Sequence, residues 1–294
     1  MMGYLANLQL SAANTTRLTL STWFRIPQDQ YDSYSSAVIS GPFVARQFGS
    51  FGIYTANTST EVRLTGLNVG GSLRWLFIFA TGDGGFNYPL SSCDHQILLP
   101  ETWYHLFVAV KTEGDEYAQR CYFYLNREII NDATPAAGQV IQPLPNIGVW
   151  SQWDTFEGFF GFGSNYDQAI IDEMNPHLPA FSMDVSNGEI DVPNTVVGGS
   201  FPVNGKMDVG DFQLWVGTFI DPTNSANLDK FVVVANGIGR KVAPSVAAEA
   251  FGEQTILCSG GASSFPTNRG TGGAFTTIGT LTDFVPAASF EVIE

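Results

Sequence analysis

Hydrophobic and polar residues alternate along much of this chain with the two-residue period of a β-strand. In RLTLSTWFRIP (17–27), for example, the apolar residues Leu18, Leu20 and Phe24 occupy even-numbered positions, whereas the polar residue Thr19 occupies an odd-numbered position. Successive residues of a strand point to opposite faces of a sheet, so the segment is predicted to be a strand with distinct faces.

Other segments carry the same kind of signal. SLRWLFIFA (72–80) is a nearly continuous apolar run bounded by glycine-containing turns, which is typical of a strand covered on both faces. One short helix is predicted at 245–252. Many strands and few helices predict an all-β fold, either an antiparallel sandwich or a jelly roll. The remaining predicted strands are 103–110, 120–129, 156–163, 207–217 and 230–236.

The segment ETWYHLFVAVKTEGDEYAQRCYFYLNREI (101–129) places a histidine, His105, inside an aromatic strand. We interpret His105 as a buried, neutral residue whose two ring nitrogens are satisfied by polar neighbours, and not as a catalytic base. The side chains expected around it are Trp103, Phe107, Ala109, Cys121, Phe123 and Leu125.

Composition narrows the classes of function. Of 294 residues, 44% are hydrophobic and 14% are charged, so a large core is expected. The formal net charge is −15 and the 13 Lys and Arg residues form no cluster, which argues against a nucleic-acid or anionic-membrane partner. The sequence has neither a membrane-spanning apolar run nor a signal-peptide pattern, so a soluble protein made in the cytoplasm is expected. Cys93, Cys121 and Cys258 are widely spaced, which predicts free thiols.

Four segments together resemble the concanavalin A-like, laminin-G-like jelly-roll superfamily: LTLSTWFRIP, ETWYHLFVAVK, CYFYLNREI and GKMDVGDFQLWVG. The superfamily pattern combines an aromatic first strand, a W-x-H strand, a strand ending in Tyr-x-Asn-Gly and a late strand with an acidic residue. Arg127 stands where the superfamily usually has glycine after Asn126, so the hairpin at this point is expected to differ.

The resemblance implies a jelly roll of two curved antiparallel sheets. It covers residues 15–220, with insertions expected to be loops at 28–70 and 130–200. The implied organisation is a jelly-roll domain over 1–220, followed by C-terminal strands over 221–294 that serve attachment or packing.

A second resemblance concerns the tail. GASSFPTNRGTGGAFTTIGTL resembles a segment that follows such domains in virion proteins of tailed phages and gene-transfer-agent-like particles. It implies a virion surface protein, such as a head or tail decoration, spike or fibre subunit, made in the host cytoplasm. The implied partners are other virion proteins, host-surface polysaccharide and further copies of the chain, with a trimer as one arrangement.

The motif SNGEIDVPN is similar to the GEID motif of a glucanase family that shares this fold. Glu189 and Asp191 match the nucleophile and the residue that tunes it, but the acid/base position falls on Pro193 or Asn194, which cannot protonate a leaving oxygen. No G-x-S-x-G motif is present either. A non-enzymatic protein is therefore expected, and a polysaccharide-degrading glycoside hydrolase remains the alternative.

Two binding sites are predicted instead. Calcium is the candidate cation, because superfamily members often bind it through carboxylates and backbone oxygens; its predicted ligands are Asp83 and Asn87 in one turn and Asp208 and Asp211 in a late strand. Sugar binding is predicted where aromatic rings and polar side chains share one stretch. The residues of that stretch are Trp150, Gln152, Trp153, Asp154, Asn165 and Tyr166.

Overall fold

The computed structural model shows a chain built mainly of antiparallel sheets with few helices. It describes the backbone of residues 3–6, 16–25, 27–28, 43–54, 58–69, 72–83, 86–89, 98–115, 117–133, 208–235, 238–261, 263–265, 267–272, 276–279 and 292–293. Side chains are described for residues 16–25, 27–28, 98–115, 117–130, 208, 210–234, 239–261, 263–265 and 267–272. No helix among the described residues is long and apolar enough to cross a membrane.

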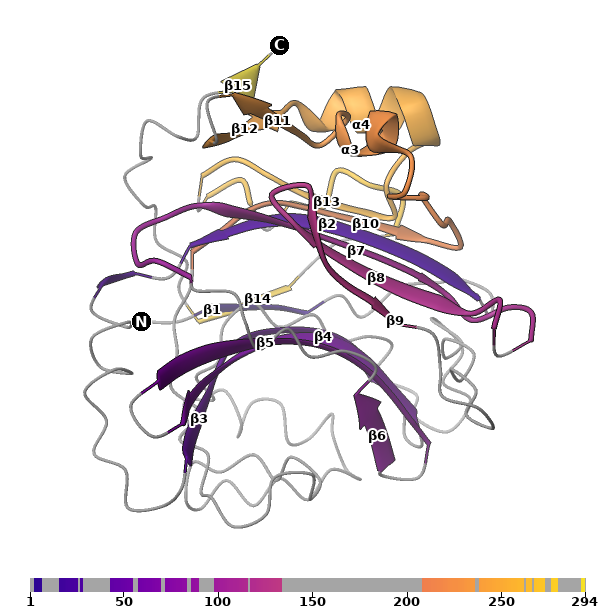
Figure 1. Cartoon of the computed structure of the whole chain (residues 1–294). Helices are drawn as coiled ribbons and strands as arrows, with labels where there is room; N and C mark the ends of the chain where they lie inside the picture. Colours follow the sequence, from indigo (N-terminus) through magenta and orange to yellow (C-terminus); the bar gives the residue numbers. More distant parts are fainter. Residues whose placement is uncertain are drawn as a thin grey trace.

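A six-stranded antiparallel sheet forms the middle of the structure (Figure 1). Its strand order is β13-β10-β2-β7-β8-β9, so strands from both halves of the chain meet in it. The strands are β2 (Arg17–Arg25), β7 (Tyr104–Lys111), β8 (Arg120–Leu125), β9 (Glu128–Ala133), β10 (Asp208–Val216) and β13 (Ile256–Cys258).

Both faces of this sheet are buried at its central strands β2 and β7. Leu20, Val108 and Phe123 are register partners on one face, and all three are at most 2% exposed. On the other face, Thr19 and Ala109 are register partners and are both fully buried. A sheet with two buried faces needs a covering layer on each side.

One covering layer is a second, curved antiparallel sheet (Figure 1). Its strand order is β3-β4-β5-β6, and a short β1–β14 pair lies between the two sheets in the view of Figure 1. Its two longest pairings, β3 with β4 and β4 with β5, join strands of 12 residues. The strands are β3 (Phe43–Tyr54), β4 (Thr58–Val69), β5 (Ser72–Asp83), β6 (Phe86–Pro89), β1 (Gly3–Ala6) and β14 (Thr276–Gly279).

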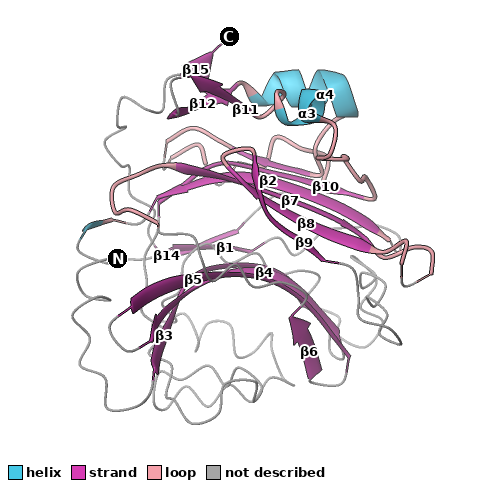
Figure 2. Cartoon of the chain, in the orientation of Figure 1, coloured by secondary structure: helices cyan, strands magenta, loops and turns pink. Residues whose placement is uncertain are grey.

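The other covering layer, here called the C-terminal layer, lies on the opposite face and contains the two labelled helices (Figure 2). Pro244 begins the longer helix, where its missing N–H leaves no hydrogen bond unmade, and Gly252 follows the helix with φ +89°. The layer consists of α3 (Ser225–Leu228), β11 (Val232–Ala235), β12 (Ile238–Val242), α4 (Pro244–Phe251) and β15 (Val292–Ile293), which pairs with β12 in parallel.

Phe231 joins the C-terminal layer to the sheet. Its ring centroid lies 5.1 Å from that of Phe107, 5.7 Å from Trp215, 5.9 Å from Phe251 and 6.2 Å from His105. The Trp215 contact is edge-to-face and the Phe251 contact is stacked, both favourable aromatic geometries. Phe231 is 1% exposed, so it is the apolar centre of this interface.

Most sequence-predicted elements are confirmed where the structure describes them, including β2, β7, β10 and α4. Two predictions are wrong. The run 120–129 is two strands, because Asn126 and Arg127 form a two-residue turn with φ values of +48° and +72°. Much of 28–70, expected as loops, forms the long strands β3 and β4.

The turn at Arg127 explains how a non-glycine residue can occupy a left-handed position. Such a residue carries a backbone penalty of about 1 kcal/mol compared with glycine. The Arg127 guanidinium forms an ion pair of 2.5 Å with Asp229, which follows α3. The side chain therefore ties the β8–β9 turn to the C-terminal layer, a contact that glycine could not make.

Replacing Phe231 with alanine is expected to lower the free energy of unfolding by about 3–5 kcal/mol, since a fully buried aromatic ring is lost from between two layers. Urea denaturation followed by tryptophan fluorescence would measure the change. Val234→Ala is the matched control on β11, where the side chain is 40% exposed, and should change stability by only about 0.5 kcal/mol. Equal effects of the two substitutions would contradict the role given to Phe231.

Candidate functional site

The structure brings a serine and a histidine together inside the interface between the six-stranded sheet and the C-terminal layer. Ser21 Oγ lies 2.9 Å from His105 Nε2. Ser21 pairs with Phe107 in the β2–β7 register, and His105 pairs with Trp23, so the two polar residues are diagonal neighbours on one face. The sequence contained each residue but no local signal that they would meet.

This pair has the atom types of a nucleophile and its base, but not their surroundings. Both residues are only 1% exposed, so a substrate cannot reach Ser21 Oγ. Among the residues that the structure describes, none forms a hydrogen bond with His105 Nδ1, whereas a catalytic histidine is oriented by a third group at that atom. The ring instead packs against Trp23, at 5.2 Å between centroids, and against Phe231. The pair is therefore a buried polar contact of the core.

The environment of His105 agrees in part with the sequence-based interpretation. Desolvation lowers the pKa of His105 to about 3, so the residue is neutral at physiological pH, as expected. The expectation that both ring nitrogens are satisfied is wrong, because only Nε2 is. The prediction of which side chains of the neighbouring strand β8 share a face with His105 is also wrong. Register places Tyr124 opposite Phe107 and Tyr122 opposite Ala109, while Cys121, Phe123 and Leu125 lie on the other face.

Asp208, one of the predicted calcium ligands, binds an arginine. Arg25 Nε lies 2.7 Å from Asp208 Oδ2, and the same guanidinium reaches Glu101 at 2.7 Å. It also lies over the Trp103 ring, 5.6 Å from the centroid. Glu101 has φ +55°, an uncommon value for a non-glycine residue, and its carboxylate accepts a hydrogen bond of 2.7 Å from the backbone N–H of Gln28. These contacts of Arg25 join the end of β2 to the start of β10 and to the residues just before β7.

Asp211, the neighbouring predicted ligand, occupies a β-bulge. The β10–β2 register shifts between Gly210 and Gln213, and Asp211 has φ +41° within that bulge. Its carboxylate is 2% exposed and forms an ion pair with Lys241 of β12. Burial raises the pKa of Asp211, while the charges of Lys241 and Arg269 act in the opposite direction. Asp211 therefore anchors the C-terminal layer to the sheet.

The four predicted calcium ligands occupy two separate places. Asp83 and Asn87 belong to the β5–β6 hairpin, where Asp83 pairs with Phe86 and Asn87 pairs with Gly82. Asp208 and Asp211 lie on β10 and face different cations of the protein itself. Among the residues whose side chains the structure describes, no three His, Cys, Asp or Glu side chains gather in a group that could hold a metal ion.

The predicted sugar-binding stretch lies outside the described residues, and so do the residues of the GEID motif. The sugar-binding residues concerned are Trp150, Gln152, Trp153, Asp154, Asn165 and Tyr166, and their roles remain predictions.

Part of the tail that resembles a virion segment folds back on the sheet. Asn268 Oδ1 accepts hydrogen bonds from the backbone N–H of Leu257 and of Gly270, at 2.8 and 2.9 Å. A Cβ atom at Gly270 would lie 2.4 Å from the carbonyl oxygen of Gln254, so only glycine fits this close backbone contact. Burial raises the pKa of the Cys258 thiol in β13 to about 12, which makes it an unreactive core residue. The described residues between 254 and 272 are therefore packed against the six-stranded sheet.

Comparison with known proteins gives little further information. No protein-family model matches the chain, and no curated protein does. A solved structure from Bacteroides ovatus, described as a "putative carbohydrate binding protein", is similar with 13% identity and a TM-score of 0.37. The similarity covers 96% of this chain and 58% of that one, so this chain spans little more than half of that protein's length. At these values the likeness supports neither a fold assignment nor a function.

The buried histidine predicts a specific pH dependence of stability. The pKa of His105 in the folded state, about 3, lies below its unfolded value of about 6.5, so between these values the unfolded chain binds more protons. The contribution of His105 is therefore fully present above pH 6.5 and is lost as the pH falls toward 3. Between pH 7 and pH 4.5 the loss should be roughly 2–3 kcal/mol.

Urea denaturation of wild type and of His105→Gln at both pH values would isolate this contribution. The comparison is needed because the raised pKa of Asp211 acts with the opposite sign in acid. Equal pH dependence in the two proteins would rule out a neutral buried His105.

Replacing Lys241 with methionine is expected to cost about 3–5 kcal/mol of stability near pH 7, because the buried Asp211 carboxylate then loses its cation. Asp211→Asn combined with Lys241→Met should cost less than Lys241→Met alone. Thermal and urea denaturation would measure both. Arg240→Met, one position earlier on β12, is the control, and a loss as large as that of Lys241→Met would contradict the ion-pair explanation.

Proposed function

We propose that this chain is a non-enzymatic structural protein of a tailed-phage particle. In this proposal it is a jelly-roll subunit on the virion surface, such as a head or tail decoration, spike or fibre component. It makes assembly contacts with other virion proteins and further copies of itself, and it adheres to host-surface polysaccharide. The observation that carries the proposal is the six-stranded antiparallel sheet whose central strands are buried on both faces, which suits a rigid structural module.

The positions of the charged side chains support a structural role. Ion pairs join separate elements of the fold: Arg25 with Asp208 between β2 and β10, and Lys241 with Asp211 between β12 and β10. Arg17 likewise pairs with Glu113 beyond the end of β7. Carboxylates used in this way stabilise the arrangement of layers and are already neutralised by arginine or lysine.

The virion assignment and the jelly-roll topology draw on the sequence resemblances. The W-x-H strand corresponds to β7, and the late strand with an acidic residue corresponds to β10; the two lie on either side of β2 in one sheet. Calcium is proposed only as an accessory ion of the β5–β6 hairpin, which contains Asp83 and Asn87.

The adhesive part of the proposal predicts that the purified chain binds glycans on an array without cleaving them. Trp150→Ala combined with Trp153→Ala should reduce binding by about tenfold or more, because both stacking rings are removed. Circular dichroism would show that the variant remains folded. If the folded wild-type protein binds no glycan, adhesion is wrong; if new reducing ends appear in host polysaccharide, the glycoside hydrolase alternative is correct.

The structural part of the proposal has its own test. Cryo-electron microscopy of the particle should find the chain on its outer surface, and light scattering should find oligomers of the purified protein. Absence of the chain from purified particles would overturn the virion assignment, whatever the result of the glycan array.

A further inference from the structure

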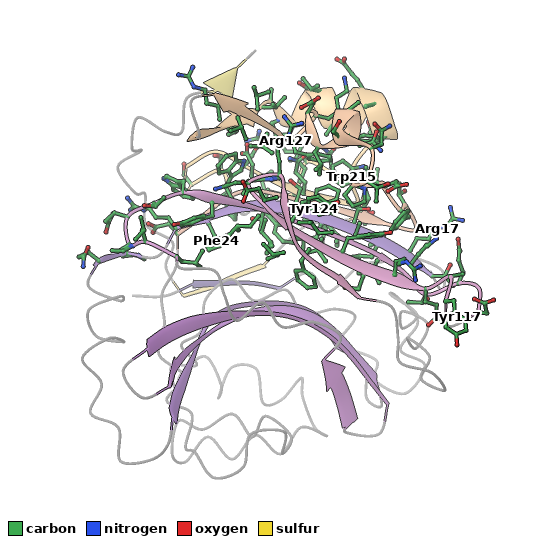
Figure 3. The ribbon with its side chains drawn as sticks, in the orientation of Figure 1. Arg17, Phe24, Tyr117, Tyr124, Arg127 and Trp215 are labelled. Carbon is green, nitrogen blue, oxygen red and sulfur yellow. The ribbon has the colours of Figure 1, made fainter. Side chains whose placement is uncertain are left out.

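The tip of the β7–β8 hairpin presents an aromatic side chain to solvent. Tyr117 is 63% exposed, the largest fraction among the exposed large hydrophobic side chains of the described residues. Figure 3 shows it at the outer end of the hairpin, beyond Arg17 and away from the C-terminal layer. The ring offers a flat apolar face and a hydroxyl group at a place where no packing role requires them.

The turn that carries Tyr117 is fixed by its own hydrogen bonds. Asp115 Oδ1 accepts from the backbone N–H of Tyr117 at 3.1 Å and of Ala118 at 2.9 Å. Gly114 has φ +98°, and a Cβ atom there would lie 2.6 Å from Ala118 Cβ. These contacts hold Asp115, Tyr117 and Ala118 in place relative to one another, so a ligand that binds them would order few groups.

The base of the hairpin is fixed as well. Gln119 Nε2 donates a buried hydrogen bond of 2.8 Å to Thr112 O. Glu113 accepts hydrogen bonds from Thr16 Oγ1 at 2.6 Å and from Arg17 Nε at 2.7 Å. These hydrogen bonds, from Arg17 first and then from Thr16, lower the pKa of Glu113. The tip thus projects from an anchored stem.

Two polar groups at the tip are available to a ligand. Within the described part of the chain, neither Asp115 Oδ2 nor the Tyr117 hydroxyl has a hydrogen-bond partner. A carboxylate oxygen accepts strongly from hydroxyl groups, and an aromatic face packs against the C–H face of a sugar ring. The net charge of −15, to which Asp115 contributes, disfavours a polyanion.

We propose that Tyr117 and Asp115 form a contact site for a neutral polysaccharide, with the Tyr117 ring against a pyranose face and Asp115 Oδ2 accepting from a ring hydroxyl. This inference rests on the adhesion included in the proposed function and names a part of the binding surface that the predicted Trp150 and Trp153 stretch does not contain.

The test uses the full chain and affinity electrophoresis through gels containing dextran, mannan or galactan, with alginate as the anionic comparison. Wild type and Tyr117→Phe should be retarded alike by at least one neutral polysaccharide, since both keep the ring. Tyr117→Ala should bind that polysaccharide about tenfold more weakly. Asp115→Asn, whose amide oxygen can still cap the turn, should bind more weakly while the melting temperature stays near that of wild type.

The outcomes separate this inference from the adhesion on which it rests. If wild type binds a neutral polysaccharide and Tyr117→Ala binds equally well, the hairpin site is wrong and adhesion through other residues stands. If wild type binds only alginate, the neutral ligand class is wrong. If wild type binds none of the four, both the hairpin site and binding to these polysaccharides are overturned. The virion assignment is tested separately, by whether purified particles contain the chain.

Discussion

Burial of both faces of one sheet is the constraint on which this structure depends. β2 and β7 contain unbroken runs of buried residues, whereas a sheet with one wet face shows alternation in exposure. The hydrophobic effect then requires two further layers, which the chain supplies from distant segments: β3–β6 on one side and the C-terminal layer on the other. Without the C-terminal layer, the rings of Trp215 and Phe107 would face water, at a cost of about 1.5–3 kcal/mol for each large apolar side chain.

Polar groups between the six-stranded sheet and the C-terminal layer determine how these two layers fit together. Gln254 donates to Gln213 at 2.9 Å, and Trp215 Nε1 donates to the carbonyl oxygen of Gly252 at 2.9 Å. Buried hydrogen bonds add little net stability, but a shifted arrangement would leave their donors and acceptors unpaired at a cost of about 1–3 kcal/mol each. Apolar packing between two layers can persist when one layer shifts relative to the other, whereas these hydrogen bonds would be broken. They therefore specify one position of the C-terminal layer on the sheet.

Sequence patterns predicted the strands well where local periodicity was strong. Leu18, Leu20 and Phe24 alternate as β2 requires, and the burial of Trp23 and Trp215 follows from their places in strands. The resemblance implied a hairpin at Asn126, but the strand predicted over 120–129 ran through it, because Asn126 and Arg127 lack the glycine that normally marks a type I′ turn. Its compensating contact, from Arg127 to Asp229, joins positions far apart in sequence and so leaves no local signal.

The candidate sites were less predictable for a related reason. The superfamily resemblance suggested Asp208 and Asp211 as calcium ligands, but their partners Arg25 and Lys241 come from other strands. A carboxylate looks the same in sequence whether it binds a metal ion or an arginine. Pairing across a sheet also decides which residues surround His105, and a difference of one residue in register moves every side chain to the other face. Local periodicity does not determine that register.

The pairing of β1 with β14 has a consequence for how the protein is made. Gly3 lies opposite Gly279, so β1 can form this pair only after the much later strand β14 has been synthesised. β12 likewise pairs with β15, which follows it in the sequence only after a long intervening segment. Contacts of such long sequence separation slow folding and leave strand edges open in the nascent protein. β1 therefore lacks this partner while the long segment between the two strands is synthesised, and protection from aggregation during that interval contributes to the yield of folded protein.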